Sequence, residues 1–154
     1  NAVVLETLRI YPIAAGTFAR VLTKPISVMG YDLEPDTWLM ISIYSLHHRE
    51  DLYPNSKQFD PQRFLHKAYS SYEYMPFGGG NRRCIGSALA LLEMKLVSAT
   101  ILSRFQLELM SDRVASRLGS KSEELKYRPM LPVRRGLTIA PPASFKMKVK
   151  SRIS

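Results

Sequence analysis

Three consecutive glycines, two arginines and the only cysteine of the chain lie within one stretch, PFGGGNRRCIG, at residues 76–86. A sequence of strong helix formers follows directly at residues 86–104, GSALALLEMKLVSATILSR. Glycine lets the backbone turn sharply and approach a ligand closely. The stretch therefore predicts a loop that presents Cys84 just before a helix, and the question is what the thiol binds.

One possible ligand is a phosphate, because free backbone N–H groups and the helix dipole attract anions to a helix start. The spacing does not fit this interpretation. A P-loop has Gly-Lys-Ser/Thr after four intervening residues, and a dinucleotide fingerprint has a third glycine where Arg83 stands. A phosphate- or nucleotide-binding module therefore remains a less favoured alternative.

The second possible ligand is a metal, because a helix start stabilises the negative charge of a thiolate. Without a CxxC motif or nearby histidine spacing, Cys84 cannot build a zinc site. Any metal must bring its other ligands with it, as iron does in haem. Gly78 to Gly80 would then let the backbone pass a flat macrocycle, and Arg82 would contact a propionate. A small buried hydrophobic role is the alternative for Cys84 alone.

The remaining sequence predicts an α+β fold in which helices are segregated from short antiparallel strands. A short helix is expected over residues 2–11, because Pro12 would break it. β-Branched segments with reversals at Gly30 and at Pro35-Asp36 predict a small antiparallel sheet within residues 17–44. Residues 47–76 show no sustained periodicity and predict an irregular but ordered coil.

Two features are expected in the C-terminal half. The helix over residues 86–104 is apolar nearly all round, which is typical of a helix buried in a larger core. Two β-like runs in RRGLTIAPPASFKMKV flank Pro141-Pro142 and predict a hairpin.

Composition limits the class of protein. The 154 residues carry 22 Lys and Arg against 13 Asp and Glu, a net charge of +9, which favours an acidic partner. Nucleic-acid binding is not expected, since no recognition module accompanies the charge. A single cysteine excludes an internal disulfide and favours a cytoplasmic location, with a membrane anchor before residue 1 left open. The abrupt start at NAVVLETLRIYP indicates a fragment.

Three motifs resemble those of one family. The cysteine loop matches F-x-x-G-x-R-x-C-x-G of the cytochromes P450, the haem-thiolate monooxygenases. ETLR resembles the family's E-x-x-R helix, and FDPQRF, residues 59–64, resembles its F-x-P-x-R-F meander. The motifs occur in family order, and the fixed positions of the loop are Phe77, Gly80, Arg82, Cys84 and Gly86.

The resemblance implies that residues 1–154 form the C-terminal part of the mainly helical cytochrome P450 fold. It has small antiparallel sheets, an irregular meander, a cysteine-ligand loop before a long buried helix, and a C-terminal hairpin. The iron of haem b would be bound by Cys84, and the cofactor would also contact the other fixed loop residues Phe77, Gly80, Arg82 and Gly86 together with Arg20 and His47. For His47 and for Arg20 a solvated loop position is the alternative.

The resemblance also implies roles away from the loop. Glu6, Arg9 and Arg63 would form a buried charge triad, since buried charges must be paired; the alternative for Glu6 and Arg9 is a surface ion pair. Two segments would contact substrate, through Ala14, Ala15, Gly16, Thr17, Phe18, Leu137 and Thr138.

The activity implied by the resemblance is oxidation of a small, apolar organic substrate with O2 and two electrons. The electrons would come from an acidic ferredoxin or a flavoprotein reductase. The family's oxygen-activating A/G-G-x-x-T helix does not occur in this sequence, so no catalytic residue is assigned and the chain alone is expected to be inactive. A noncatalytic haem-binding protein or a truncated remnant is the alternative.

Overall fold

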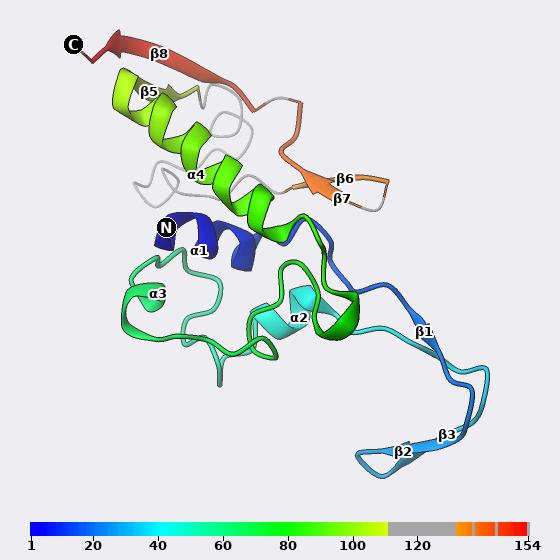
Figure 1. Cartoon of the computed structure of the whole chain (residues 1–154). Helices are drawn as coiled ribbons and strands as arrows, with labels where there is room; N and C mark the ends of the chain where they lie inside the picture. Colours follow the sequence, from blue (N-terminus) through cyan, green and yellow to red (C-terminus); the bar gives the residue numbers. More distant parts are fainter. Residues whose placement is uncertain (111–131, 137, 144, 154) are drawn as a thin grey trace, which may run out of the picture. The chain divides into compact units, whose positions relative to one another are not determined.

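The computed structural model describes residues 1–110, 132–136, 138–143 and 145–153 (Figure 1). The chain divides into two compact units, Asn1–Ser87 and Ala88–Ser154. The first unit contains helices α1 (Ala2–Ile10), α2 (Ile43–His47) and α3 (Arg63–His66) and a 3-10 turn, η1 (Gly80–Arg82). Its four short strands are β1 (Arg20–Val21), β2 (Ile26–Val28), β3 (Tyr31–Leu33) and β4 (Trp38–Leu39).

Helix α1 ends as expected from the sequence. The last turn closes with the Tyr11 N–H donating to the Thr7 carbonyl at 2.8 Å. The next residue, Pro12, is buried and has no N–H to continue the ladder. The C-terminal half of α1 faces the interior, where Leu8 and Ile10 are buried.

The small antiparallel sheet predicted within residues 17–44 consists of two separate pairs. β1 pairs with β4 in the register Arg20↔Leu39, and β2 pairs with β3 in the register Ile26↔Leu33. The β2–β3 turn has positive φ at both Met29 (51°) and Gly30 (84°), as in a type I′ hairpin. The predicted reversal at Gly30 is thus confirmed.

The meander over residues 48–76 has little regular structure besides α3, and aromatic contacts hold it instead. Tyr53 is completely buried and stacks on Tyr69 with the ring centroids 4.7 Å apart. Phe64 packs against Tyr74 at 5.0 Å. The Tyr74 hydroxyl donates to the Leu5 carbonyl at 2.9 Å, which attaches the meander to α1.

The second unit contains helix α4 (Ser87–Arg104) and strands β5 (Phe105–Leu109), β6 (Val133–Arg135), β7 (Thr138–Ala140) and β8 (Met147–Arg152). The hairpin predicted across Pro141-Pro142 is wrong. β7 pairs with β6 across Gly136, whose φ is 63°, and β8 pairs with β5. The two prolines follow directly after β7, where the missing N–H groups end the ladder.

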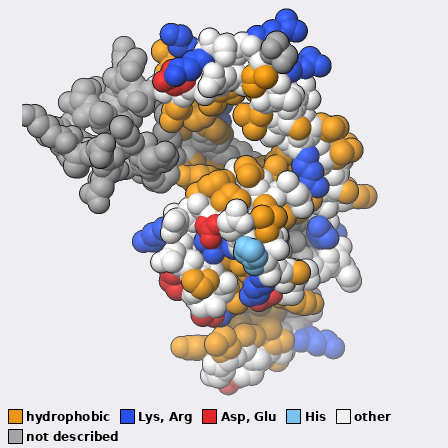
Figure 2. Space-filling view, turned by 90° about the vertical axis from the view of Figure 1, so that its left-hand side faces the viewer, with side chains coloured by type: hydrophobic (Ala, Val, Ile, Leu, Met, Phe, Trp, Pro, Cys, Tyr) orange, Lys and Arg blue, Asp and Glu red, His pale blue; other side chains and the backbone are white. Residues whose placement is uncertain are grey.

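Helix α4 confirms the predicted helix but leaves its apolar side chains at the surface. Leu89, Leu92, Leu96 and Leu102 are 59%, 52%, 57% and 61% exposed, and only Ser87 of the helix is buried. Hydrophobic side chains are widely exposed on the face of the molecule shown in Figure 2. No described helix has both the length and the apolarity needed to cross a bilayer.

Candidate functional site

A buried ion cluster joins α1 to the meander. Glu6 and Arg9 lie one turn apart on α1, and both are 0% exposed. Arg9 Nε donates to Glu6 Oε2 at 2.7 Å and Arg9 Nη2 donates to Glu6 Oε1 at 2.9 Å. The guanidinium and carboxylate therefore meet in the two-pronged geometry that makes such pairs strong, and the pair is not a surface decoration.

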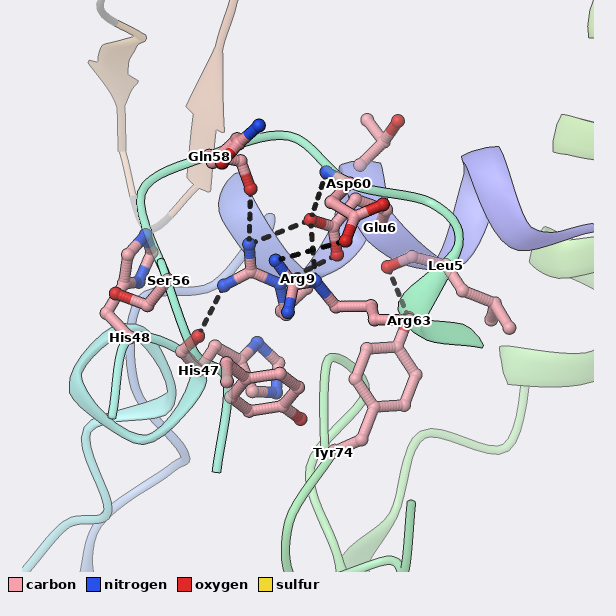
Figure 3. Close-up of polar contacts among 12 residues, drawn as sticks. Leu5, Glu6, Arg9, His47, His48, Ser56, Gln58, Asp60, Arg63 and Tyr74 are labelled. Carbon is pink, nitrogen blue, oxygen red and sulfur yellow. Dashed lines mark hydrogen bonds and ion pairs between the residues drawn. The ribbon is translucent and has the colours of Figure 1, made fainter. Parts of the chain in front are cut away.

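The meander completes the cluster from the other side (Figure 3). Arg63 Nε donates to Glu6 Oε1 at 3.1 Å, and only 7% of the Arg63 side chain is exposed. The backbone N–H of Asp60 donates to the same oxygen at 2.9 Å. The structure thus brings together Glu6, Arg9 and Arg63, the three residues of the predicted triad.

Asp60 is a fourth member that the sequence did not identify. Besides its N–H bond to Glu6, its carboxylate lies 4.0 Å from Arg63 Nη2 and is 42% exposed on the side-chain measure. Asp60 could have been predicted from its position between Phe59 and Pro61 in the FDPQRF motif. The acidic side chain offsets part of the excess positive charge of two arginines on one glutamate.

Arg9 has acceptors beyond Glu6. Its Nη1 donates to the His47 carbonyl at 2.7 Å and its Nη2 reaches the Gln58 carbonyl at 3.3 Å. The guanidinium also lies 5.0 Å from the centroid of the Tyr53 ring, within cation–π range. These partners offset the free-energy cost of removing the Arg9 charge from water.

The cysteine loop is closed by backbone hydrogen bonds. The Cys84 N–H donates to the Phe77 carbonyl at 3.0 Å, and the Arg83 N–H donates to the Gly80 carbonyl at 3.1 Å within η1. Cys84 itself is free and exposed, while Phe77 is half-buried. The loop therefore anchors the backbone of the cysteine and leaves its sulfur accessible.

Two of the three consecutive glycines of the loop have left-handed backbone conformations. Gly78 and Gly80 have φ values of 73° and 63°, a region that side chains disfavour, and a Cβ built on either would meet nothing within 4 Å. A Cβ on Gly86 would lie 3.8 Å from Cys84 Sγ. The space around Gly78 and Gly80 is thus open, and Gly86 places no side chain against the Cys84 sulfur.

Two cations predicted to contact propionates are exposed. Arg82 lies in η1, and Arg20 lies on β1, where its Nη1 donates to the carbonyls of Phe18 at 3.3 Å and Ala19 at 3.2 Å. Neither forms an ion pair with a residue of the described part of the chain. Contact with a propionate stays a prediction for both.

His47 is not available for the propionate contact that the resemblance implied. It is 0% exposed, its Nε2 accepts the Met75 N–H at 3.0 Å, and its ring stacks on Tyr74 at 5.3 Å. The rings of Tyr53 and Tyr74 pack against the imidazole, so no part of it is exposed for a contact from outside. A solvated loop position is wrong for the same reason.

Burial lowers the pKa of His47 to about 4; the backbone of Arg9 opposes this effect, and the charges of Arg9 and His48 add to it. In the unfolded chain the pKa is about 6.5, so that state takes up a proton first as the pH falls. We expect the His47 contribution to stability to be complete above pH 6.5. It is lost between pH 6.5 and about 4, on the order of 3 kcal/mol at most.

Urea unfolding of the intact haem-loaded protein across this pH range measures the effect. His47→Gln should flatten the slope of unfolding free energy against pH, whereas the matched change His66→Gln, at an exposed residue of α3, should leave it unchanged. Equal slopes for wild type and His47→Gln would contradict the prediction.

The first predicted substrate segment, residues 14–18, forms an extended bridge to the segment before α2. Gly16 pairs with Ser42, the Thr17 N–H donates to the Ile41 carbonyl at 2.9 Å, and the Tyr44 N–H donates to the Ala15 carbonyl at 3.0 Å. Ala14 is half-buried, and Phe18 is 79% exposed. Substrate contact by these residues remains a prediction.

The second predicted substrate segment lies in the other unit. Thr138 is exposed on β7, with its hydroxyl donating to the Arg135 carbonyl at 3.0 Å. Leu137 lies outside the described residues. Contact of either with substrate is likewise a prediction.

The donor chemistry of the loop fits haem. Among the described residues no group of three or more His, Cys, Asp or Glu side chains is placed to hold a metal ion. Cys84 would supply one sulfur ligand, which suits an iron whose other ligands come from a macrocycle. The open surface beside Gly78 and Gly80 suits a flat group.

Comparisons with known proteins agree with this geometry. The cytochrome P450 family profile matches residues 1–125. Cytochrome P450 9e2 of Blattella germanica is 40% identical over 116 residues, covering 72% of this chain and 22% of that protein. Taurochenodeoxycholic 6 alpha-hydroxylase of Sus scrofa is 45% identical over 104 residues, covering 66% of this chain and 20% of that protein.

A solved structure shows the same fold. Retinoic acid-bound cyanobacterial CYP120A1 superposes with a TM-score of 0.81 and 25% identity over 99% of this chain and 32% of that chain. The architecture is thus that of the haem-thiolate class. The chain belongs to the cytochrome P450 family. It spans about a fifth of the length of the curated relatives that it matches.

Proposed function

We propose that the protein carrying this chain is a monooxygenase that binds haem b through Cys84. The observation that carries the proposal is the loop itself, with an accessible sulfur, a Cys84 N–H fixed on the Phe77 carbonyl and two glycines at positive φ. Bound haem supplies the chemistry, which is activation of O2 and transfer of one oxygen atom to a substrate C–H bond.

The residues of this chain have three tasks in that function. Cys84 would supply the sulfur that binds the iron, from a position just before the start of α4. Arg82 and Arg20, both exposed, would pair with the two propionates and orient the macrocycle. The ion cluster of Glu6, Arg9 and Arg63 holds α1 against the meander that leads into the loop.

The proposed substrate is a small, apolar organic molecule. Phe18 is 79% exposed beside the bridge to Ser42, so it offers an apolar contact to such a molecule. Two similar proteins are a retinoic acid-bound cyanobacterial CYP120A1 and a taurochenodeoxycholic 6 alpha-hydroxylase of Sus scrofa, which supports an organic substrate.

The proposed electron donor is an acidic redox protein, such as a ferredoxin or a flavoprotein reductase. The net charge of +9 and the exposed Arg83, which directly precedes Cys84, favour such a partner. Electron transfer should slow as ionic strength rises, measured by stopped-flow reduction of the haem protein. A rate independent of salt would contradict an electrostatic docking step.

The test of the ligand is Cys84→Ser in the intact haem-loaded protein. Wild type, reduced and treated with CO, should show the strongly red-shifted Soret band of a thiolate-bound haem. Cys84→Ser should abolish the band completely, because a hydroxyl does not replace a thiolate as the ligand of the iron. The measurement is the reduced-CO difference spectrum at equal haem content.

Asn81→Ala is the matched control, since Asn81 lies exposed in η1 of the same loop and should keep the band. A wild-type spectrum typical of histidine ligation would overturn the proposal. A phosphate-binding module would instead show nucleotide affinity that survives Cys84→Ser. A noncatalytic haem protein would keep the band but form no oxidised product with O2 and electrons.

A further inference from the structure

We propose that His47 is a positioning residue for the cysteine loop, acting through the Met75 amide on the turn that offers the Phe77 carbonyl to Cys84. The inference rests on the proposed role of Cys84 as iron ligand. His47 lies outside both the ion cluster and the cysteine loop. Hydrogen bonds connect it to each of these two regions.

The imidazole of His47 is held rigidly at one end of this connection. His47 is the last residue of α2, its ring stacks on Tyr74 with an interplanar angle of 19°, and it meets the Tyr53 ring edge-on at 6.3 Å. Its carbonyl accepts Arg9 Nη1 at 2.7 Å. The position of the ring is therefore fixed both by aromatic packing and by the ion cluster.

The other end of the connection is the Met75 amide. Met75 is 5% exposed, and His47 Nε2, 28 residues away in sequence, accepts its N–H at 3.0 Å. A buried N–H without an acceptor costs about 1 to 3 kcal/mol. Because Nε2 is the acceptor, the imidazole is neutral with its proton on Nδ1.

From Met75 the connection continues into the loop. The Gly78 N–H donates to the Met75 carbonyl at 2.9 Å and closes a four-residue turn that contains the buried Pro76. Phe77, inside that turn, accepts the Cys84 N–H on its carbonyl at 3.0 Å. The direction of the Phe77 carbonyl, and hence the place of the Cys84 backbone, depends on the Met75 amide.

As a consequence, the binding of the Cys84 sulfur to iron depends on a hydrogen-bond acceptor atom at position 47. Without that acceptor the Met75 N–H must turn toward water, and the 75–78 turn opens more often. Cys84 then leaves its fixed position more often, so a larger share of the iron loses its thiolate ligand. The ring packing of His47 on Tyr74 does not by itself have this effect.

Two substitutions separate the acceptor from the ring. His47→Phe keeps the stack on Tyr74 and removes the acceptor, whereas His47→Gln removes the ring and places an amide oxygen where it can accept the Met75 N–H. Both are compared with wild type in the intact haem-loaded protein. The readouts are hydrogen exchange of the Met75, Gly78 and Cys84 amides and the share of haem with the red-shifted reduced-CO band.

For His47→Phe we expect exchange of these three amides to rise about tenfold and the band to be partly lost. For His47→Gln we expect exchange and band close to wild type. The Tyr11 amide, at the end of α1, is the internal control and should stay protected in both variants. If His47→Phe does not fold, retained protection in His47→Gln still supports the acceptor role.

The proposal is overturned if the two variants behave alike, if His47→Phe leaves the loop amides protected, or if His47→Gln exposes them. An equal rise at Tyr11 would also overturn it, because His47 would then serve general packing only. If the wild-type protein lacks the red-shifted band, the proposal that Cys84 binds the iron is wrong. The hydrogen-exchange measurements on the two variants would still decide the role of His47.

Discussion

Glu6→Gln is expected to destabilise the protein by about 3 to 5 kcal/mol and to remove haem incorporation with it. The change keeps the size of the side chain but removes the charge on which Arg9 and Arg63 both rely, at 2.7 Å and 3.1 Å. It also turns an N–H donor of glutamine toward at least one guanidinium. Urea unfolding and the haem-to-protein ratio after purification measure the two effects.

Glu34→Gln is the matched control, because Glu34 is exposed in the turn after β3 and should change stability by less than about 0.5 kcal/mol. Arg63→Met should act in the same direction as Glu6→Gln, since the meander loses its charged anchor. Normal holoprotein from Glu6→Gln would show that the cluster does not support the haem site.

The isolated chain, residues 1–154, is expected to show no cooperative thermal transition and to retain no stoichiometric haem. Helix α4 leaves Leu89, Leu92, Leu96 and Leu102 more than half exposed, which is far from the burial that stabilises an apolar helix. The meander adds an ordering cost of about 1 to 2 kcal/mol per residue. Circular dichroism melting with haem titration measures both outcomes.

A sharp transition with one haem bound per chain would contradict this expectation and favour a self-sufficient haem-binding protein. A useful comparison is α4 with Leu92 and Leu96 both replaced by Gln. If exposed apolar surface causes aggregation, the double variant should be more soluble while remaining unable to melt cooperatively.

Local sequence signals were sufficient for part of the fold. Pro12 ends α1 and Gly30 allows the β2–β3 turn, because proline lacks an N–H and glycine accepts positive φ wherever they occur. The C-terminal hairpin was wrong because strand pairing depends on which distant strand is available. β8 pairs with β5, whose last residue lies 38 positions before Met147.

The ion cluster was predicted by motif resemblance, not by pattern alone. A Glu and an Arg three residues apart on a helix are usually a surface pair, and nothing local says that Arg63 will reach Glu6. The burial of His47 was not predicted, because it depends on residues that are distant in the sequence. The residues around it, LHHRED, are polar, and its burial comes from Tyr53 and Tyr74, which follow later in the sequence.

The spacing of the cluster also orders events during synthesis on the ribosome. Arg9 follows Glu6 by three residues, whereas the Asp60 amide and Arg63 follow it by 54 and 57. Protein synthesis adds roughly 5 to 20 residues per second, so several seconds pass in which Arg9 is the only ionic partner of Glu6 from this cluster. Cys84 is synthesised after Arg63, so the arginine that anchors the meander is present in the nascent chain before the cysteine of the loop.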